Sequence, residues 1–246
     1  MKVIVYGASG RMGGNMLKVV EDSKEHTLVA AVSPELTTCP ADNTYGSLSE
    51  FQGEADMIVD FSHHTAVGPL LDYARSRKLP VVIGTTGHTP EELQQIAAAS
   101  REIPVFRSGN MSVGIALLVR LAKETAKVFP DGQVEIVETH HDQKLDVPSG
   151  TALMLAEGVK AVRPESVYNI GRPEGGKRAH NEIGIHSLRM GNVVGIHEVL
   201  VTTGTQTITL KHEAHDRMLF AQGAMAAAEY LLGKAPGLYN METMLG

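Results

Sequence analysis

The chain has 246 residues, of which 43% are apolar, so it can build one large domain or two modest ones around real cores. Its formal net charge of −6 offers no basic field to nucleic acid, and no run of about eighteen apolar residues predicts a membrane span. The N-terminus enters a strand without a signal-peptide core, and Cys39 is the only cysteine, which excludes an intrachain disulfide. We therefore expect a cytoplasmic protein that binds neither nucleic acid nor membrane.

A strand, a glycine turn and a helix open the chain. The apolar run Val3-Ile4-Val5 predicts a strand covered on both faces, the helix is expected to end near Val20, and residues 27–32 predict a second strand. In such a βαβ unit, glycines let the backbone approach a pyrophosphate, and the helix N-terminus receives its charge. The residues predicted to bind a nicotinamide dinucleotide here are Gly7, Ala8, Ser9, Gly10, Arg11 and Met12, with Ser9 in the place of a second glycine.

The residue after the second strand bears on the choice of cofactor. A dehydrogenase that prefers NAD usually carries Asp or Glu there, because a carboxylate binds the ribose hydroxyls. This chain has Ser33, followed by Pro34 and Glu35, and no Arg or Lys nearby to pair with a 2′-phosphate. We expect Ser33 to contact the cofactor, and both NADH and NADPH to be used, with affinities within roughly one decade of each other.

Further strand–helix units follow in the first half. Residues 57–61, 81–83 and 104–106 predict strands, and residues 65–77 and the segment capped by Thr89 predict helices. Repeated βα units indicate a parallel, doubly wound sheet of the Rossmann type, in which ligands bind beyond the carboxyl ends of the strands. Two of these strand ends are predicted to contact the cofactor. Their residues are Gly84, Thr85 and Thr86 after the strand at 81–83, and Ser108, Gly109, Asn110 and Met111 after the strand at 104–106.

The second half has a different pattern. A helix is predicted over residues 113–128, a strand over 133–137 and a helix over 151–162, followed by strands at 182–189, 197–203 and 207–212 and a helix from 216 to about 232. The fold class is therefore α/β. We expect a Rossmann-type dinucleotide-binding domain from residues 1–110 and 217–246, and between them an α+β domain with a mixed or antiparallel sheet.

A polar loop, residues 138–152 with the sequence ETHHDQKLDVPSGTA, joins a predicted strand to a predicted helix. Ser149 is expected to cap the helix, so that the N–H groups of Gly150 and Thr151 open its first turn. Such N–H groups favour a carboxylate or a phosphate. This end of the loop therefore predicts an anion-binding site.

Proton transfer is the second property of the loop. Lys144 adds a positive charge, and either His140 or His141 can exchange a proton near neutral pH. A metal site is disfavoured, because adjacent histidines at a strand end point to opposite faces. Each residue alone would also suit an ordinary solvated loop, but together they suit an anionic substrate that takes up a proton.

The string ETHHDQKLDVPSGTA resembles the signature of the 4-hydroxy-tetrahydrodipicolinate reductase (dihydrodipicolinate reductase) family of bacterial and plant lysine biosynthesis, and the resemblance extends over nearly the whole chain. It implies reduction of a small dicarboxylate, 4-hydroxy-tetrahydrodipicolinate, to tetrahydrodipicolinate with loss of water, by NADH or NADPH and without a metal. It also implies a homotetramer that pairs the sheets of a substrate-binding and oligomerisation domain, residues 111–216.

The same resemblance implies a role for each residue of the loop. His140 would be the acid/base group and Lys144 the proton donor, while His141, Gly150 and Thr151 would bind the substrate. Two alternatives remain open: a dehydrogenase acting on homoserine or aspartate, which the loop fits less well, and a dinucleotide-sensing regulator, which would not need Lys144 beside a Pro-Ser-Gly-Thr turn.

Overall fold

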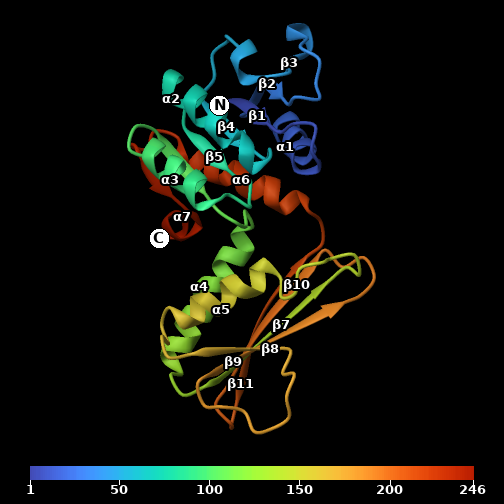
Figure 1. Ribbon diagram of the computed structural model, residues 1–246, viewed down its shortest axis with the longest axis vertical. Helices are drawn as coiled ribbons and strands as arrows, with labels where there is room; N and C mark the ends of the chain where they lie inside the picture. The colour runs from blue at the N-terminus through green and yellow to red at the C-terminus, as the bar shows by residue number, and fades with distance from the viewer. The chain divides into compact units, whose positions relative to one another are not determined.

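The computed structural model describes all 246 residues, and they form two compact units. The first unit consists of Met1–Ser112 and Arg217–Gly246, and the second of Val113–Asp216 (Figure 1). No helix of either unit combines the length and apolar character that a membrane crossing requires.

A seven-stranded parallel sheet forms the centre of the first unit, with the order β12-β6-β5-β4-β1-β2-β3. Its strands are β1 (Lys2–Tyr6), β2 (Thr27–Val32), β3 (Thr44–Tyr45), β4 (Met57–Asp60), β5 (Val81–Ile83), β6 (Pro104–Arg107) and β12 (Gly237–Tyr239). Because β1 lies between β2 and β4, the strand order changes direction beside it, which is where such sheets bind ligands. The predicted Rossmann-type sheet is confirmed. Strands β3 and β12 fall outside the prediction.

Helices cover both faces of this sheet. Helix α1 (Arg11–Glu21) packs beside α6 (Met218–Leu231) on one face, where Phe106 of β6 meets Tyr230 edge to face. On the other face, α2 (Val67–Arg77) and α3 (Pro90–Ala99) close a separate core. The remaining short helices are η1 (Pro40–Asp42), η2 (Leu48–Glu50), η3 (His64–Ala66) and α7 (Met241–Leu245). Burial on both faces explains the uninterrupted apolar runs of the strands.

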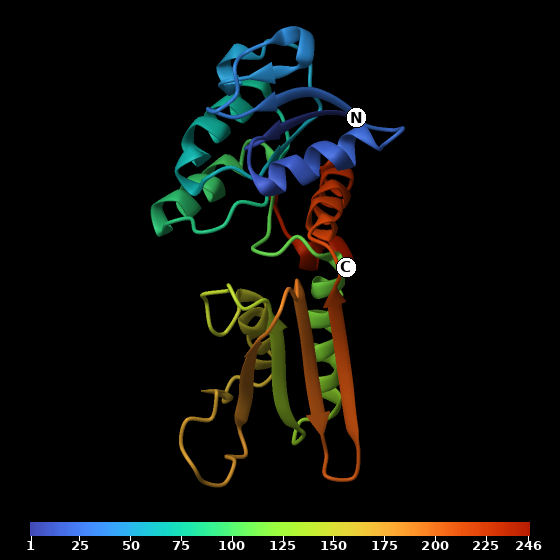
Figure 2. The same cartoon turned by 90° about the vertical axis from the view of Figure 1, so that its right-hand side faces the viewer.

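The second unit contains a five-stranded sheet with the order β11-β10-β7-β9-β8. Its strands are β7 (Gln133–His140), β8 (Val167–Ile170), β9 (Glu182–Arg189), β10 (Gly195–Thr202) and β11 (Thr207–Ala214). Pairing is antiparallel from β7 to β11 and parallel from β7 to β8, so the predicted mixed sheet is confirmed. Helices α4 (Val113–Val128) and α5 (Gly150–Lys160) cover one face of the sheet (Figure 2).

The register of β7 determines which of its side chains face these helices. Val134 and Ile136 are buried in the core that α4 and α5 close. Because successive side chains of a strand alternate between faces, Glu138 and His140 lie on the same side as these two residues. The carboxyl end of β7 therefore directs two polar groups towards the covered face, and the loop that follows the strand leads to the start of α5 at Gly150.

Candidate active site

The glycine turn after β1 has the geometry that close ligand approach requires. Gly7 has a φ of +81°, and a Cβ atom there would lie 2.5 Å from the carbonyl oxygen of Phe61. A Cβ atom at Gly13 would lie 2.1 Å from the carbonyl oxygen of Gly7, so α1 packs tightly on the turn. Gly10 is the N-cap of α1, and no side chain caps the helix. Its first N–H groups are therefore not occupied by a cap, which suits a pyrophosphate.

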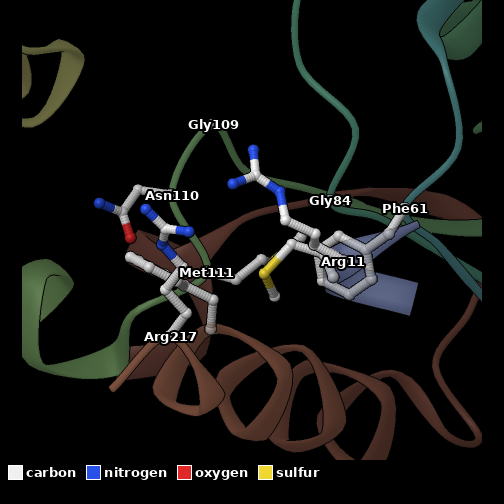
Figure 3. Close-up of a pocket in the computed structure, with 9 residues that line it drawn as sticks. Arg11, Phe61, Gly84, Gly109, Asn110, Met111 and Arg217 are labelled. Carbon is white, nitrogen blue, oxygen red and sulfur yellow. The ribbon is translucent and has the colours of Figure 1, made fainter. Parts of the chain in front are cut away.

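A cavity of about 330 Å³ lies in the first unit beside this turn (Figure 3). The predicted cofactor residues that line it are Arg11, Met12, Gly84, Gly109, Asn110 and Met111. Phe61, Arg217 and Phe220 also line it and were missed by sequence reasoning. Phe61 directly follows β4, as Gly84 follows β5. Because ligands bind beyond the carboxyl ends of these strands, its position could have indicated it as well. Arg217 and Phe220 lie at the start of α6, far along the chain from the glycine turn and the strand ends that indicated the other residues.

Several other predicted cofactor residues lie at the same turn and strand ends without lining the cavity. Thr85 is buried and its hydroxyl donates to the carbonyl oxygen of Ser62 at 3.4 Å, whereas Thr86 is exposed. The hydroxyl of Ser108 donates to the carbonyl oxygen of Asn110 at 2.6 Å. Ser108 therefore shapes the loop that carries Asn110. Gly7, Ala8, Ser9 and Gly10 form the glycine turn itself.

A carboxylate stands at the end of β2, where none was expected. Glu35 Oε2 accepts hydrogen bonds from the hydroxyls of Ser33, at 2.6 Å, and of Ser9, at 2.8 Å. These two hydrogen bonds hold the pKa of Glu35 below its usual value, and the bond from Ser33 has the larger effect. Ser33 is only 2% exposed. The expectation that this position lacks an acid is corrected: Glu35 reaches it from two residues downstream.

In the second unit, Glu138 and His140 form a buried pair at the end of β7. His140 Nδ1 lies 2.5 Å from Glu138 Oε2, and the Glu138 side chain is fully buried. Arg189 donates from Nη1 and Nη2 to the two carboxylate oxygens, each at 2.9 Å. The register explains the arrangement, because His140 lies opposite Arg189 of β9 and Glu138 lies opposite His197 of β10.

Burial and hydrogen bonding set the charges of this pair. Burial alone would raise the pKa of Glu138, but its hydrogen bonds, led by those from Arg189, lower that pKa to about 2. Burial lowers the pKa of His140, although the Glu138 carboxylate opposes that effect. Near neutral pH the pair is therefore a carboxylate and a neutral imidazole.

His197 links this pair to the start of α5. Its ring meets that of His140 edge to face, with centroids 5.1 Å apart, and its Nε2 lies 3.3 Å from the Ser149 hydroxyl. Burial, and then the proximity of His140, lower the pKa of His197 to about 3, so it stays neutral. Ser149 caps α5 as predicted, because its hydroxyl accepts from the N–H of Ala152 at 3.2 Å. Gly150 is exposed in the first turn of that helix.

The structure separates the two histidines that residue chemistry alone left equivalent. His140 is buried within the cluster, whereas His141 is half-buried in the loop that follows, where its backbone N–H donates to the carbonyl oxygen of Val193 at 2.8 Å. Lys144 belongs to the same loop, and its Nζ lies 2.8 Å from Asp146 Oδ1. The Lys144 side chain is 22% exposed, so it stays accessible while it is paired.

Comparison with known proteins covers the whole chain. The family model described as "Dihydrodipicolinate reductase, N-terminus" matches residues 1–111, and the one described as "Dihydrodipicolinate reductase, C-terminus" matches residues 114–245. A 4-hydroxy-tetrahydrodipicolinate reductase of Caldanaerobacter subterraneus subsp. tengcongensis is 45% identical over 100% of this chain and 98% of its own length. A 4-hydroxy-tetrahydrodipicolinate reductase of Clostridium novyi is 40% identical over 99% of this chain and 98% of its own length.

Solved structures agree with these matches. A dipicolinate-bound dihydrodipicolinate reductase from Paenisporosarcina sp. TG-14 superposes with a TM-score of 0.83 at 26% identity, covering 98% of this chain and 97% of that one. An amine dehydrogenase from Mycobacterium smegmatis shares the fold alone, with a TM-score of 0.69 at 12% identity. The match covers 99% of this chain and 95% of that one. With both family models matched and relatives at up to 45% identity over the full length, the chain belongs to the dihydrodipicolinate reductase family.

Proposed function

We propose that this protein reduces 4-hydroxy-tetrahydrodipicolinate to tetrahydrodipicolinate in lysine (diaminopimelate) biosynthesis in the cytoplasm. The observation that carries the proposal is the buried Glu138–His140 pair beside the capped start of α5, within the segment that resembles the family signature. The relative that superposes over nearly its whole length is named as bound to dipicolinate, a planar dicarboxylate. A dicarboxylate is also the ligand that the N–H groups at the start of α5 would favour.

In the proposed reaction the hydroxyl group leaves as water with one proton, and a hydride takes its place on the ring. The dinucleotide, when bound at the glycine turn and the cavity of the first unit, supplies the hydride. Gly150, Thr151 and His141 hold the substrate, and the helix N-terminus compensates the charge of a carboxylate. His140 and Lys144 exchange protons with the substrate. These assignments accord with the neutral imidazole of His140 and the accessible ammonium of Lys144.

A coupled assay tests the proposal. The unstable substrate is generated in situ from pyruvate and aspartate semialdehyde, and oxidation of NADH and of NADPH by the purified protein is followed separately. Turnover with this substrate, and none with homoserine or aspartate, is the expected result. Binding of NADH without turnover of any substrate would instead support the sensing regulator and overturn the proposal.

For the cofactor, we propose that both NADH and NADPH serve and that NADH is favoured. An acid at the end of β2 binds the ribose hydroxyls of NADH and repels a 2′-phosphate. Glu35 occupies that position, held by Ser9 of the glycine turn and by Ser33. Its exposure to solvent weakens the repulsion, so we expect a preference within roughly one decade.

Replacing Glu35 by Gln should reverse this preference. The loss of the negative charge should lower the KM for NADPH and raise that for NADH, changing their ratio by about tenfold. The KM values are measured in the coupled assay with each cofactor varied in turn. Glu50→Gln is the matched control, because Glu50 is also an exposed carboxylate of the first unit that accepts a bond from a hydroxyl, that of Thr38. Equal KM ratios in wild type and Glu35→Gln would exclude this role for Glu35.

We also propose a homotetramer in which the sheets of the second units pair. No helix of the second unit covers the face opposite α4 and α5, and Leu188, Ile196 and Leu200 lie on that side of β9 and β10. Apolar side chains on an open sheet face favour burial in an assembly. We expect light scattering to give the mass of four chains, and Leu200→Glu to give a smaller species. A monomeric wild-type protein would contradict the proposal.

A further inference from the structure

We infer that Glu138, held in place by Arg189, is a positioning residue that keeps His140 in the tautomer with its proton on Nδ1 and a lone pair on Nε2. The inference rests on the proposed reduction, in which His140 exchanges a proton. It concerns a residue that touches neither substrate nor cofactor and acts through the imidazole.

All the hydrogen-bonding partners of the Glu138 carboxylate are donors. Oε1 accepts from Arg189 Nη2 at 2.9 Å and from the N–H of Ser149 at 3.1 Å, and Oε2 accepts from Arg189 Nη1 at 2.9 Å. A carboxylate held in this way can only accept. The contact of 2.5 Å to His140 Nδ1 therefore requires the proton on Nδ1, which leaves Nε2 as the basic nitrogen.

The same carboxylate fixes the surroundings of the imidazole. Arg189 donates to the carbonyl oxygen of Asp146 at 2.6 Å as well as to Glu138, so it ties the loop that carries Lys144 to β7. Through the N–H of Ser149, Glu138 also holds the residue that caps α5. One buried group thus sets the tautomer of His140 and connects it to the two elements assigned to the substrate.

On the Nε2 side of the ring, the glycine at position 195 of β10 leaves space, because a Cβ atom there would come within 3.1 Å of Nε2. The charged and titratable groups around His140 are Glu138 on β7, Lys144 in the loop, Arg189 on β9 and His197 on β10. Of these, Glu138 favours the protonated imidazole, and Lys144 and Arg189 disfavour it.

Replacing Glu138 by Gln tests the inference. Arg189 should attract the amide oxygen, so that the amide NH₂ donates to His140 Nδ1 and drives the proton to Nε2. We expect kcat to fall roughly 10²-fold or more, with the KM for NADH unchanged. Because Glu138 favours protonation of His140, the limb of the pH profile assigned to His140 should also move to lower pH. Glu135→Gln, on the same strand, is the matched control, since Glu135 pairs with Arg178 and His186 away from His140.

A direct reading of the tautomer separates positioning from a purely structural role. Nitrogen-15 NMR of the histidine rings, with the His140 signals assigned from a His140→Gln variant, should show Nδ1–H in the wild type and Nε2–H in Glu138→Gln. A folded Glu138→Gln variant with wild-type kcat, or one that keeps Nδ1–H, would overturn the inference. If Glu138→Gln does not fold, the wild type alone tests the inference. A neutral His140 that carries its proton on Nε2 in the wild type would overturn it. Absent turnover in the wild type would count against the proposed function and leave the tautomer measurement unaffected.

Discussion

Replacing Lys144 by Ala is expected to lower kcat roughly 10²- to 10⁴-fold, the usual contribution of a positioned proton donor. Lys144 lies in the loop after β7 and pairs only with Asp146 in the structure, where the Nζ–Oδ1 distance is 2.8 Å. Because Asp146 is mostly exposed, losing this ion pair should cost little stability. The coupled assay measures kcat, and thermal unfolding measures stability.

Two further variants distinguish proton donation from simple charge. Arginine keeps the positive charge but does not release a proton near neutral pH, so Lys144→Arg should retain most of the substrate affinity and still lose kcat. Lys160→Ala removes another lysine of the second unit, one that lies over the ring of Tyr168, and should leave kcat unchanged. Near-wild-type turnover in a folded Lys144→Ala variant would exclude the assigned role.

Replacing Thr151 by Pro is expected to weaken competitive inhibition by pyridine-2,6-dicarboxylate about 10- to 100-fold. Thr151 is the second residue of α5, and its N–H is not the one that the Ser149 cap occupies. Proline removes that N–H, and a hydrogen bond to a charged group contributes about 1.5–3 kcal/mol. Proline is tolerated in the first turn of a helix, so the fold should survive.

Thr151→Ala is the matched control for this prediction, because it removes the hydroxyl and keeps the backbone N–H. Inhibition close to that of the wild type is expected for Thr151→Ala, and the dissociation constant of NADH should not change in either variant. Equal loss in both variants would assign the contact to the hydroxyl. Unchanged inhibition of Thr151→Pro would show that the dicarboxylate binds elsewhere.

The sequence by itself determined the features that depend on local signals. The glycine turn between an apolar strand and a helix predicted the parallel sheet of the first unit, which the structure confirms. Ser149 and Thr89 were recognisable as helix caps because a cap needs only its own side chain and the N–H groups that follow it. The polar loop between β7 and α5 was likewise visible in one continuous segment.

Only the tertiary structure decided how residues far apart in the chain act together. The pairing of β7 with β9 and β10 brings Arg189 and His197 to the buried Glu138–His140 pair, and this distinguishes His140 from His141. The path of the chain after β2 brings Glu35 back to Ser9. The alternation of side chains along a strand predicts which of its residues share a face. Only strand order and register determine which residues of the neighbouring strands lie beside them. Hydrogen bonding then sets the charge of Glu138, because a buried carboxylate stays ionised when donors from several elements converge on it.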